Sequence, residues 1–216
     1  IVKPERVMPT TVEIVDIAGL VKGASKGEGL GNKFLGNIRE TNAIIHVLRC
    51  FDDDNIIHVD GSVDPVRDKE TIDMELQLKD LEALEILYDK NVRTAKSGDK
   101  EGQKILATCE KYIAHLEAGN SARSVVASED ELEIIETLQL ITAKPVMYMC
   151  NVDEQSVKTG NKHVTAVKEA VKNEAAEVLL IATAIEAEIA ELEDVEEQLM
   201  FLEELGLEKP GVHYLI

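Results

Sequence analysis

The chain has 216 residues, of which 44% are hydrophobic and 30% are charged, and its formal net charge is −19. This composition is typical of a folded globular protein rather than a disordered one, and no apolar stretch approaches the roughly 18 residues that a membrane span needs. The excess of acidic side chains repels phosphate backbones, which argues against a general nucleic-acid binder.

Residues 12–16 (VEIVD) predict a β-strand that ends in an acid, and a glycine-rich loop follows it. The Asp16 carboxylate could hold a water on Mg²⁺, and the Gly19 amide could approach a γ-phosphate without a Cβ in the way. The same short pattern also describes many tight turns. Six glycines between Gly19 and Gly36 favour a mobile switch or a backbone anion cradle over a plain flexible loop.

The remaining strands alternate with helices. Residues 34–41 predict a short helix, and the apolar runs at 43–51, 145–151 and 178–184 predict strands buried on both faces of a parallel sheet. Strands alternating with helices indicate an α/β fold with a mostly parallel, doubly wound sheet.

The middle of the chain predicts two amphipathic helices around a turn at residues 96–99, which together form an antiparallel hairpin. We therefore expect an inserted helical subdomain at 68–130, within a domain made of 1–67 and 131–216. Ordinary helix packing is favoured over a partner-binding groove for the two apolar stripes, which are Met74, Leu78, Leu81, Leu84 and Tyr88, and Ile105, Cys109, Tyr112 and Leu116.

Several candidate ligand contacts follow the predicted strands, at the edge where doubly wound sheets bind ligands. The Asn151 amide offers both a donor and an acceptor for a base edge, and Glu154 adds an acid; an Asx turn is the alternative for this segment. The small residues 182–184 would let the backbone approach a ligand ring, although close core packing explains them equally well. Phe51 could stack on a base, but taken alone it is better read as a core residue.

His58 lies in the loop after the second predicted strand. A histidine near a phosphate site could position water or donate a proton, while a structural or surface histidine is the more common case. Asp52–Asp54 are read as a solvated turn, because consecutive acids point in different directions. Three cysteines without zinc spacing favour a reducing cytoplasm.

Residues 16–32 (DIAGLVKGASKGEGLGN) strongly resemble the switch region of the YchF/Obg-like ATPase family of P-loop proteins. Residues 51–59 (FDDDNIIHV), 151–154 (NVDE), 186–192 and 205–211 are similar to that family in the same order, so the resemblance covers essentially the whole chain. It implies a G domain with an inserted coiled-coil hairpin, hydrolysis of ATP with Mg²⁺, and association with the ribosome.

The resemblance also implies roles for particular residues. Asn151 and the Val152 backbone would contact adenine, Phe51 would lie against its ring, and the backbone of Ala182, Thr183 and Ala184 would close the base pocket. GTPases of this class read guanine with Asn-Lys-x-Asp, and here Val152 and Glu154 replace the Lys and the Asp. The longer acid should not fit the guanine edge, so ATP is expected and GTP is the alternative.

Ras-like proteins have a glutamine at the position of Leu20 to orient the attacking water. Leucine cannot do this, and the resemblance implies His58 as the substitute, with the Gly19 amide on the γ-phosphate and Asp16 acting through Mg²⁺. The phosphate loop Gly-x-x-x-x-Gly-Lys-Ser/Thr does not occur in these residues. It would precede Ile1, and the family's TGS domain would follow Ile216, so we expect a fragment that is inactive by itself.

The expected partner is the ribosome, and no membrane is expected. The glycine-rich region is locally basic and could meet RNA, although solvated lysine is the commoner case; its cations are Lys22, Lys26, Lys33 and Arg39. A non-catalytic module that binds the ribosome or a protein is the alternative from a different functional class.

Overall fold

The computed structural model describes residues 11–17, 30–56, 58 and 61–214. Its sheet has three parallel strands in the order β1–β2–β3, which are β1 (Ile44–Arg49), β2 (Val146–Asn151) and β3 (Glu177–Ile181). The runs predicted at 43–51, 145–151 and 178–184 are therefore strands, and the α/β fold class is confirmed. The third run is shorter than predicted, because Thr183 already begins a helix.

The helices lie before, between and after the strands along the chain. The α-helices are α1 (Leu30–Glu40), α2 (Pro65–Lys96), α3 (Lys100–Glu117), α4 (Glu129–Glu136), α5 (Lys162–Val171), α6 (Thr183–Glu191) and α7 (Val195–Leu205). Short 3₁₀ turns are η2 (Ala122–Ser124), η3 (Ile141–Ala143), η4 (Glu154–Ser156) and η5 (Gly211–Tyr214). No helix among the described residues is both long and apolar enough to cross a membrane.

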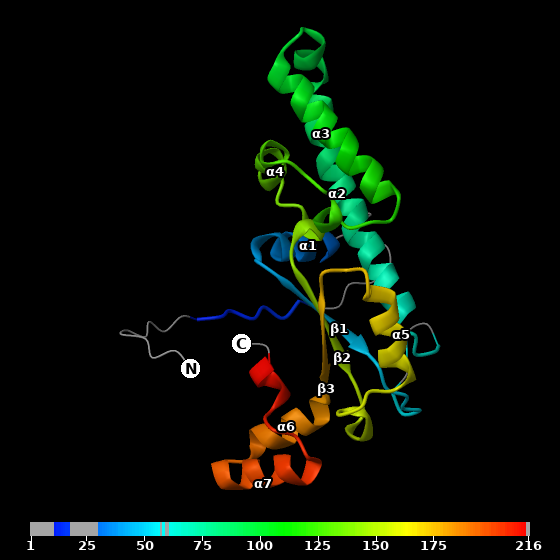
Figure 1. Ribbon diagram of the computed structural model, residues 1–216, viewed down its shortest axis with the longest axis vertical. Helices are drawn as coiled ribbons and strands as arrows, with labels where there is room; N and C mark the ends of the chain where they lie inside the picture. The colour runs from blue at the N-terminus through cyan, green and yellow to red at the C-terminus, as the bar shows by residue number, and fades with distance from the viewer. Residues whose placement is uncertain (1–10, 18–29, 57, 59–60, 215–216) are drawn as a thin grey trace.

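One face of the sheet carries the main core. Val146, Tyr148 and Cys150 alternate along β2 and pack in one cluster with Val164 and Val167 of α5. The opposite face is more open at β1, where Ile45 and Val47 are 39% and 57% exposed. Figure 1 shows the helical hairpin at one end of the sheet and the α6–α7 pair at the other.

Helices α2 and α3 form the predicted hairpin. Asp64 caps α2 by accepting a hydrogen bond from the Arg67 amide, and Asp99 caps α3 by accepting one from the Gly102 amide. The predicted stripe on α3 is confirmed at Cys109, Tyr112 and Leu116, which are buried.

The predicted stripe on α2 is partly wrong. Met74 and Leu78 are 60% and 43% exposed, whereas Leu76 and Leu84 are buried. Polar side chains, among them the fully buried Asp80, share the inward face of α2. A hydrophobicity pattern therefore cannot identify this face.

The strand predicted at 12–16 is absent. Residues 11–17 have no regular secondary structure, and Figure 1 shows them running out from the body of the molecule. Residues 11–16 are exposed, and only Ile17 packs against a core cluster, that of Leu35 and Ile38. An alternating sequence becomes a strand only when a neighbouring strand satisfies its backbone groups, and none of the described strands pairs with this segment.

Candidate functional site

The carboxyl ends of the three strands form one edge, and backbone hydrogen bonds continue across it beyond the strands. The Cys50 amide donates to the Asn151 carbonyl at 2.7 Å, and the Val152 amide donates to the Ile181 carbonyl at 2.8 Å. Asn151 ends β2, and Phe51 and Ala182 come just after these bonds, so the structure brings the three predicted residues to one edge. This is the position where open α/β sheets bind ligands.

The Asn151 side chain is held in one orientation. Its Oδ1 accepts hydrogen bonds from the Thr183 amide at 3.2 Å and the Thr183 hydroxyl at 3.1 Å. These bonds use the acceptor side of the amide, so its donor, Nδ2, is the atom left to meet a ligand. Ala182 is 2% exposed, whereas Thr183 and Ala184 are exposed.

The segment after Asn151 divides into a buried and an exposed part. Val152 is 4% exposed, so its side chain belongs to the core, and its amide is bonded to the Ile181 carbonyl at this edge. Glu154 is exposed at the start of η4. The turn expected here exists, but Asp153 makes it by accepting hydrogen bonds from the amide and hydroxyl of Ser156, both at 3.0 Å.

Phe51 is partly buried and is covered by a cation. The Arg49 guanidinium carbon lies 4.8 Å from the centroid of the Phe51 ring. The same guanidinium donates to three backbone carbonyls of the following turn, those of Phe51 (3.2 Å), Asp53 (3.2 Å) and Ile56 (3.0 Å). Arg49 was not predicted from the sequence as a residue of this edge. Its only signal in the sequence is that it is a charged residue within an apolar run.

Asn161 was also missed, although it fixes the same edge. Its Nδ2 donates to the Cys50 carbonyl at 2.7 Å, and its Oδ1 caps α5 by accepting from the amides of His163 and Val164. A polar residue before a helix signals a cap but not a contact 111 residues away along the chain. Beside it Asp52 pairs with Lys162 at 3.0 Å, and hydrogen bonding by Lys162 lowers the pKa of the Asp52 carboxyl.

His58 lies at the beginning of the hairpin. Its Nε2 is 2.9 Å from Oδ2 of Asp68, which stands in the first turn of α2. The other oxygen of Asp68 accepts from Arg67 Nη2 at 3.0 Å, and Arg67 also donates to the Ser62 carbonyl at 2.8 Å. His58 is therefore held by a network of polar side chains next to the start of α2.

The remaining predicted residues are not brought to this edge. Asp16 stands exposed on the irregular segment 11–17, so its expected place at the end of a strand is wrong. Gly19, Lys22 and Lys26 lie outside the described residues, as does the side chain of Lys33. The described residues contain no group of three or more His, Cys, Asp or Glu side chains that could hold a metal ion.

Arg39 does not fit the expected basic surface patch. Its side chain is partly buried, and its Nε is a buried atom without a hydrogen-bond partner among the described residues. Arg39 is on α1 next to the buried Leu35 and Ile38, and its charge acts on Asp80 of the hairpin.

Known proteins resemble this chain in sequence and in fold. Residues 2–91 match the family described as "50S ribosome-binding GTPase". The chain is 52% identical over 216 residues to the protein named "Ribosome-binding ATPase YchF" of Haemophilus ducreyi and 46% identical over 218 residues to that of Bacillus subtilis. Each alignment covers 100% of this chain but only 59% of the relative, so the chain spans little more than half the length of these proteins.

A solved structure, titled "Structure of the Schizosaccharomyces pombe YchF GTPase", has a TM-score of 0.77 and 34% sequence identity. The match covers 92% of this chain and 55% of that chain. Fold and sequence therefore point to the same group of proteins, with the nucleotide-binding class of fold that the sequence predicted. The chain belongs to the YchF family.

Proposed function

We propose that the intact protein hydrolyses ATP to ADP and phosphate and acts with the ribosome. The proposal that the protein binds an adenine base rests on the fixed orientation of the Asn151 side-chain amide, whose oxygen accepts hydrogen bonds from Thr183. A donor presented at the ligand-binding edge suits a ring nitrogen of adenine, and the backbone of residues 182–184 lies beside it. Relatives named as ribosome-binding ATPases support both parts.

Loss of the Asn151 amide tests the base contact. In the intact protein, we expect Asn151→Ala to weaken ATP binding at least tenfold, because both the donor and the link to Thr183 are lost. Asn120→Ala, at the far side of the hairpin base, is the control and should bind as the unchanged protein does. Equal affinity in the two variants would contradict the assignment.

GTP is the second candidate, because the matching family and the fission yeast structure are both described as GTPases. Our preference for ATP rests on Glu154, which is exposed at the start of η4 and is one methylene longer than the aspartate that reads guanine. Competition between ATP and GTP in the intact protein decides between them. Glu154→Asp should move the preference toward GTP, whereas the exposed control Glu133→Asp should not; no movement would refute the argument from side-chain length.

For the chemical step, we propose in-line attack of water on the γ-phosphate, with His58 placing the water and the Gly19 amide meeting the phosphate. Asp68 holds His58 at 2.9 Å, which supports a defined imidazole orientation. Asp16 is proposed to act through Mg²⁺ in the intact protein, although the described residues assemble no metal cluster. His58→Ala should abolish turnover, while His213→Ala, an exposed histidine, should not.

The hairpin, taken as the subdomain 68–130, is proposed as a contact surface for the ribosome, with RNA contacts from Lys22, Lys26 and Lys33. A non-catalytic binding module would bind ribosomes without turnover, so the rate of ATP hydrolysis by the intact protein with and without ribosomes separates the two classes. The cytoplasm is the proposed location, because Cys50, Cys109 and Cys150 are all free and buried.

A further inference from the structure

A hollow of about 630 Å³ lies at the end of the sheet opposite Asn151. Its walls come from the end of α1 and the turn after it, from the base of the hairpin with α4, and from the segment that leads into β2. Thr41 and Asn42 precede β1 and Lys144 precedes β2, so the hollow is at the amino ends of strands whose carboxyl ends carry the base site. Strands of six residues separate the two places by roughly 20 Å.

Three side-chain nitrogens in the described part of the chain are buried without a hydrogen-bond partner, and all belong to residues that line this hollow. They are Nε of Arg39 and both Nε and Nη1 of Arg123. A buried guanidinium N–H without an acceptor lowers the stability of the fold, because it loses its hydrogen bonds to water and no protein group replaces them. The negative charge of Asp80 lies near Arg39 and partly compensates it, so Arg123 is the less compensated of the two cations.

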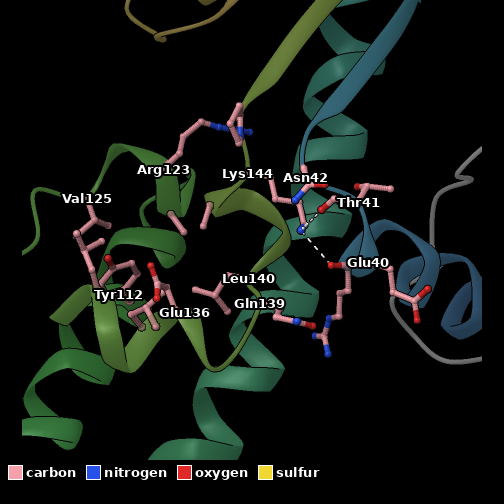
Figure 2. A pocket seen from close by; sticks show the side chains of 16 residues that line it. Glu40, Thr41, Asn42, Tyr112, Arg123, Val125, Glu136, Gln139, Leu140 and Lys144 are labelled. Carbon is pink, nitrogen blue, oxygen red and sulfur yellow. Dashed lines mark hydrogen bonds between the residues drawn. The ribbon is translucent and has the colours of Figure 1, made fainter. Parts of the chain in front are cut away.

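Two further polar groups meet the same space. Tyr112 lines the hollow and is only 2% exposed. Lys144 Nζ donates to the carbonyls of Arg39 at 3.0 Å and Thr41 at 2.5 Å, which fixes the turn after α1 and adds a positive charge. Figure 2 shows Lys144, Thr41 and Asn42 on one side of the hollow and Tyr112 and Val125 on the other.

The rest of the lining is suited to an organic molecule. Leu132, Ile135 and Leu140 contribute apolar surface, and the volume is within the range of small-molecule sites. Two carboxylates, Glu40 and Glu136, also line the hollow, but both are exposed and water screens them. The positively charged residues of the hollow are partly buried, and the negatively charged ones are exposed.

We propose that this hollow binds a small organic anion, a carboxylate or a phosphate attached to an apolar body. The anionic group accepts hydrogen bonds from the Arg123 guanidinium, and the apolar body lies against Leu132 and Leu140. Such a ligand touches the end of α1, the hairpin base and the entry to β2 at once. The site is separate from the nucleotide edge and does not depend on ATP hydrolysis.

The test is a titration of this chain followed by the chemical shifts of its backbone amides, with benzoate, phenyl phosphate and the neutral benzyl alcohol as probes. We expect saturable shifts at residues 122–125 and 139–144 with one or both anions, and binding of benzyl alcohol weaker by about tenfold or more. The better of the two anions identifies the carboxylate or the phosphate as the preferred group. Benzyl alcohol binding as tightly as both anions, or shifts that do not saturate, would overturn the proposal.

Variants test the sign of the charge. Arg123→Gln should weaken anion binding by about tenfold, Glu136→Gln should strengthen it, and Arg93→Gln on the exposed hairpin tip should leave it unchanged. If Arg123→Gln does not fold, Arg39→Gln and Glu136→Gln provide the same comparison at the two other charges. Anion affinity that is the same in every folded variant would show that these side chains do not form the site.

Discussion

Asp80 is expected to be a principal anchor of the hairpin, and its removal gives a measurable loss of stability. The side chain is 0% exposed and joins α2 to η3, 61 residues further along the chain. Its Oδ1 accepts from the Ile141 amide at 2.8 Å, and its Oδ2 accepts from the Thr142 amide and hydroxyl, both at 2.7 Å. Burial raises the pKa of the Asp80 carboxyl, while hydrogen bonds from Thr142 and Ile141 lower it, so these bonds offset part of the cost of the buried charge.

Asp80→Ala leaves three buried donors without an acceptor. Each loss is worth about 1–3 kcal/mol, and part of the total is recovered because a buried charge is removed, so we expect unfolding to become easier by about 3–5 kcal/mol. Asp80→Asn keeps one acceptor oxygen but turns an NH₂ group toward a donor, so its cost should lie between those of the alanine variant and the unchanged chain. The assay is urea unfolding followed by circular dichroism.

Asp89→Ala is the matched control, because Asp89 is exposed on the same helix. It should change the unfolding free energy by less than about 0.5 kcal/mol. Hydrogen exchange adds a local measurement: amides of η3 should lose protection in Asp80→Ala and keep it in Asp89→Ala. If Asp80→Ala unfolds at the same urea concentration as the control, the hydrogen bonds to η3 do not hold the hairpin, and the reasoning is refuted.

Three more outcomes are expected at other positions of the chain. Lys69 Nζ lies 2.6 Å from a carboxylate oxygen of Asp73 and 2.8 Å from one of Glu174. Lys69→Met leaves both carboxylates without this buried partner and should lower the free energy of unfolding in urea by about 2–4 kcal/mol. Lys90→Met, at an exposed position of the same helix, should leave the free energy of unfolding unchanged. Gly102→Ala should cost about 1–3 kcal/mol, since its Cβ would lie 2.9 Å from the Ala95 nitrogen, while Ala107→Gly, exposed on the same helix, should cost about 1 kcal/mol at most. Burial lowers the pKa of His46 from 6.5, so the unfolded chain takes up a proton more readily than the folded one, and stability should fall as the pH drops below about 6.5. His46→Leu should remove part of this fall between pH 5 and 7 in urea unfolding. An identical pH dependence in both proteins would contradict the argument.

The sequence was sufficient wherever a local pattern determines the outcome. Nearly continuous apolar runs predicted the three strands of the described sheet. Residues at or directly after the ends of those strands, such as Asn151 and Ala182, lie at a common edge because parallel strands end on the same side. The segment 12–16 has equally good alternation but no neighbouring strand among the described residues, so its pattern alone could not make it a strand.

Contacts between distant polar residues could not be predicted in this way. Asn161 reaches the Cys50 carbonyl and Asp80 reaches the Thr142 amide, and neither residue carries a signal for a partner so far along the chain. The inward face of α2 was misjudged for the same reason. Hydrophobic periodicity assigns polar residues to solvent, whereas here a buried aspartate occupies the core-facing side and leaves Met74 and Leu78 exposed.

The two buried polar contacts of α2 together fix the direction of the hairpin as well as its position. Lys69 binds Glu174, which also accepts a hydrogen bond from the Tyr148 hydroxyl of β2, and Asp80 binds the turn just before the same strand. The two residues are separated by eleven positions, or about 16 Å of helix. A single contact would leave the helix free to rotate about that point. Two contacts this far apart, one next to β2 and one at the turn before β2, fix the direction of the helix axis. The hairpin beyond Asp80 therefore projects from the sheet as Figure 1 shows, stiffened by its own core of Leu84, Cys109 and Tyr112.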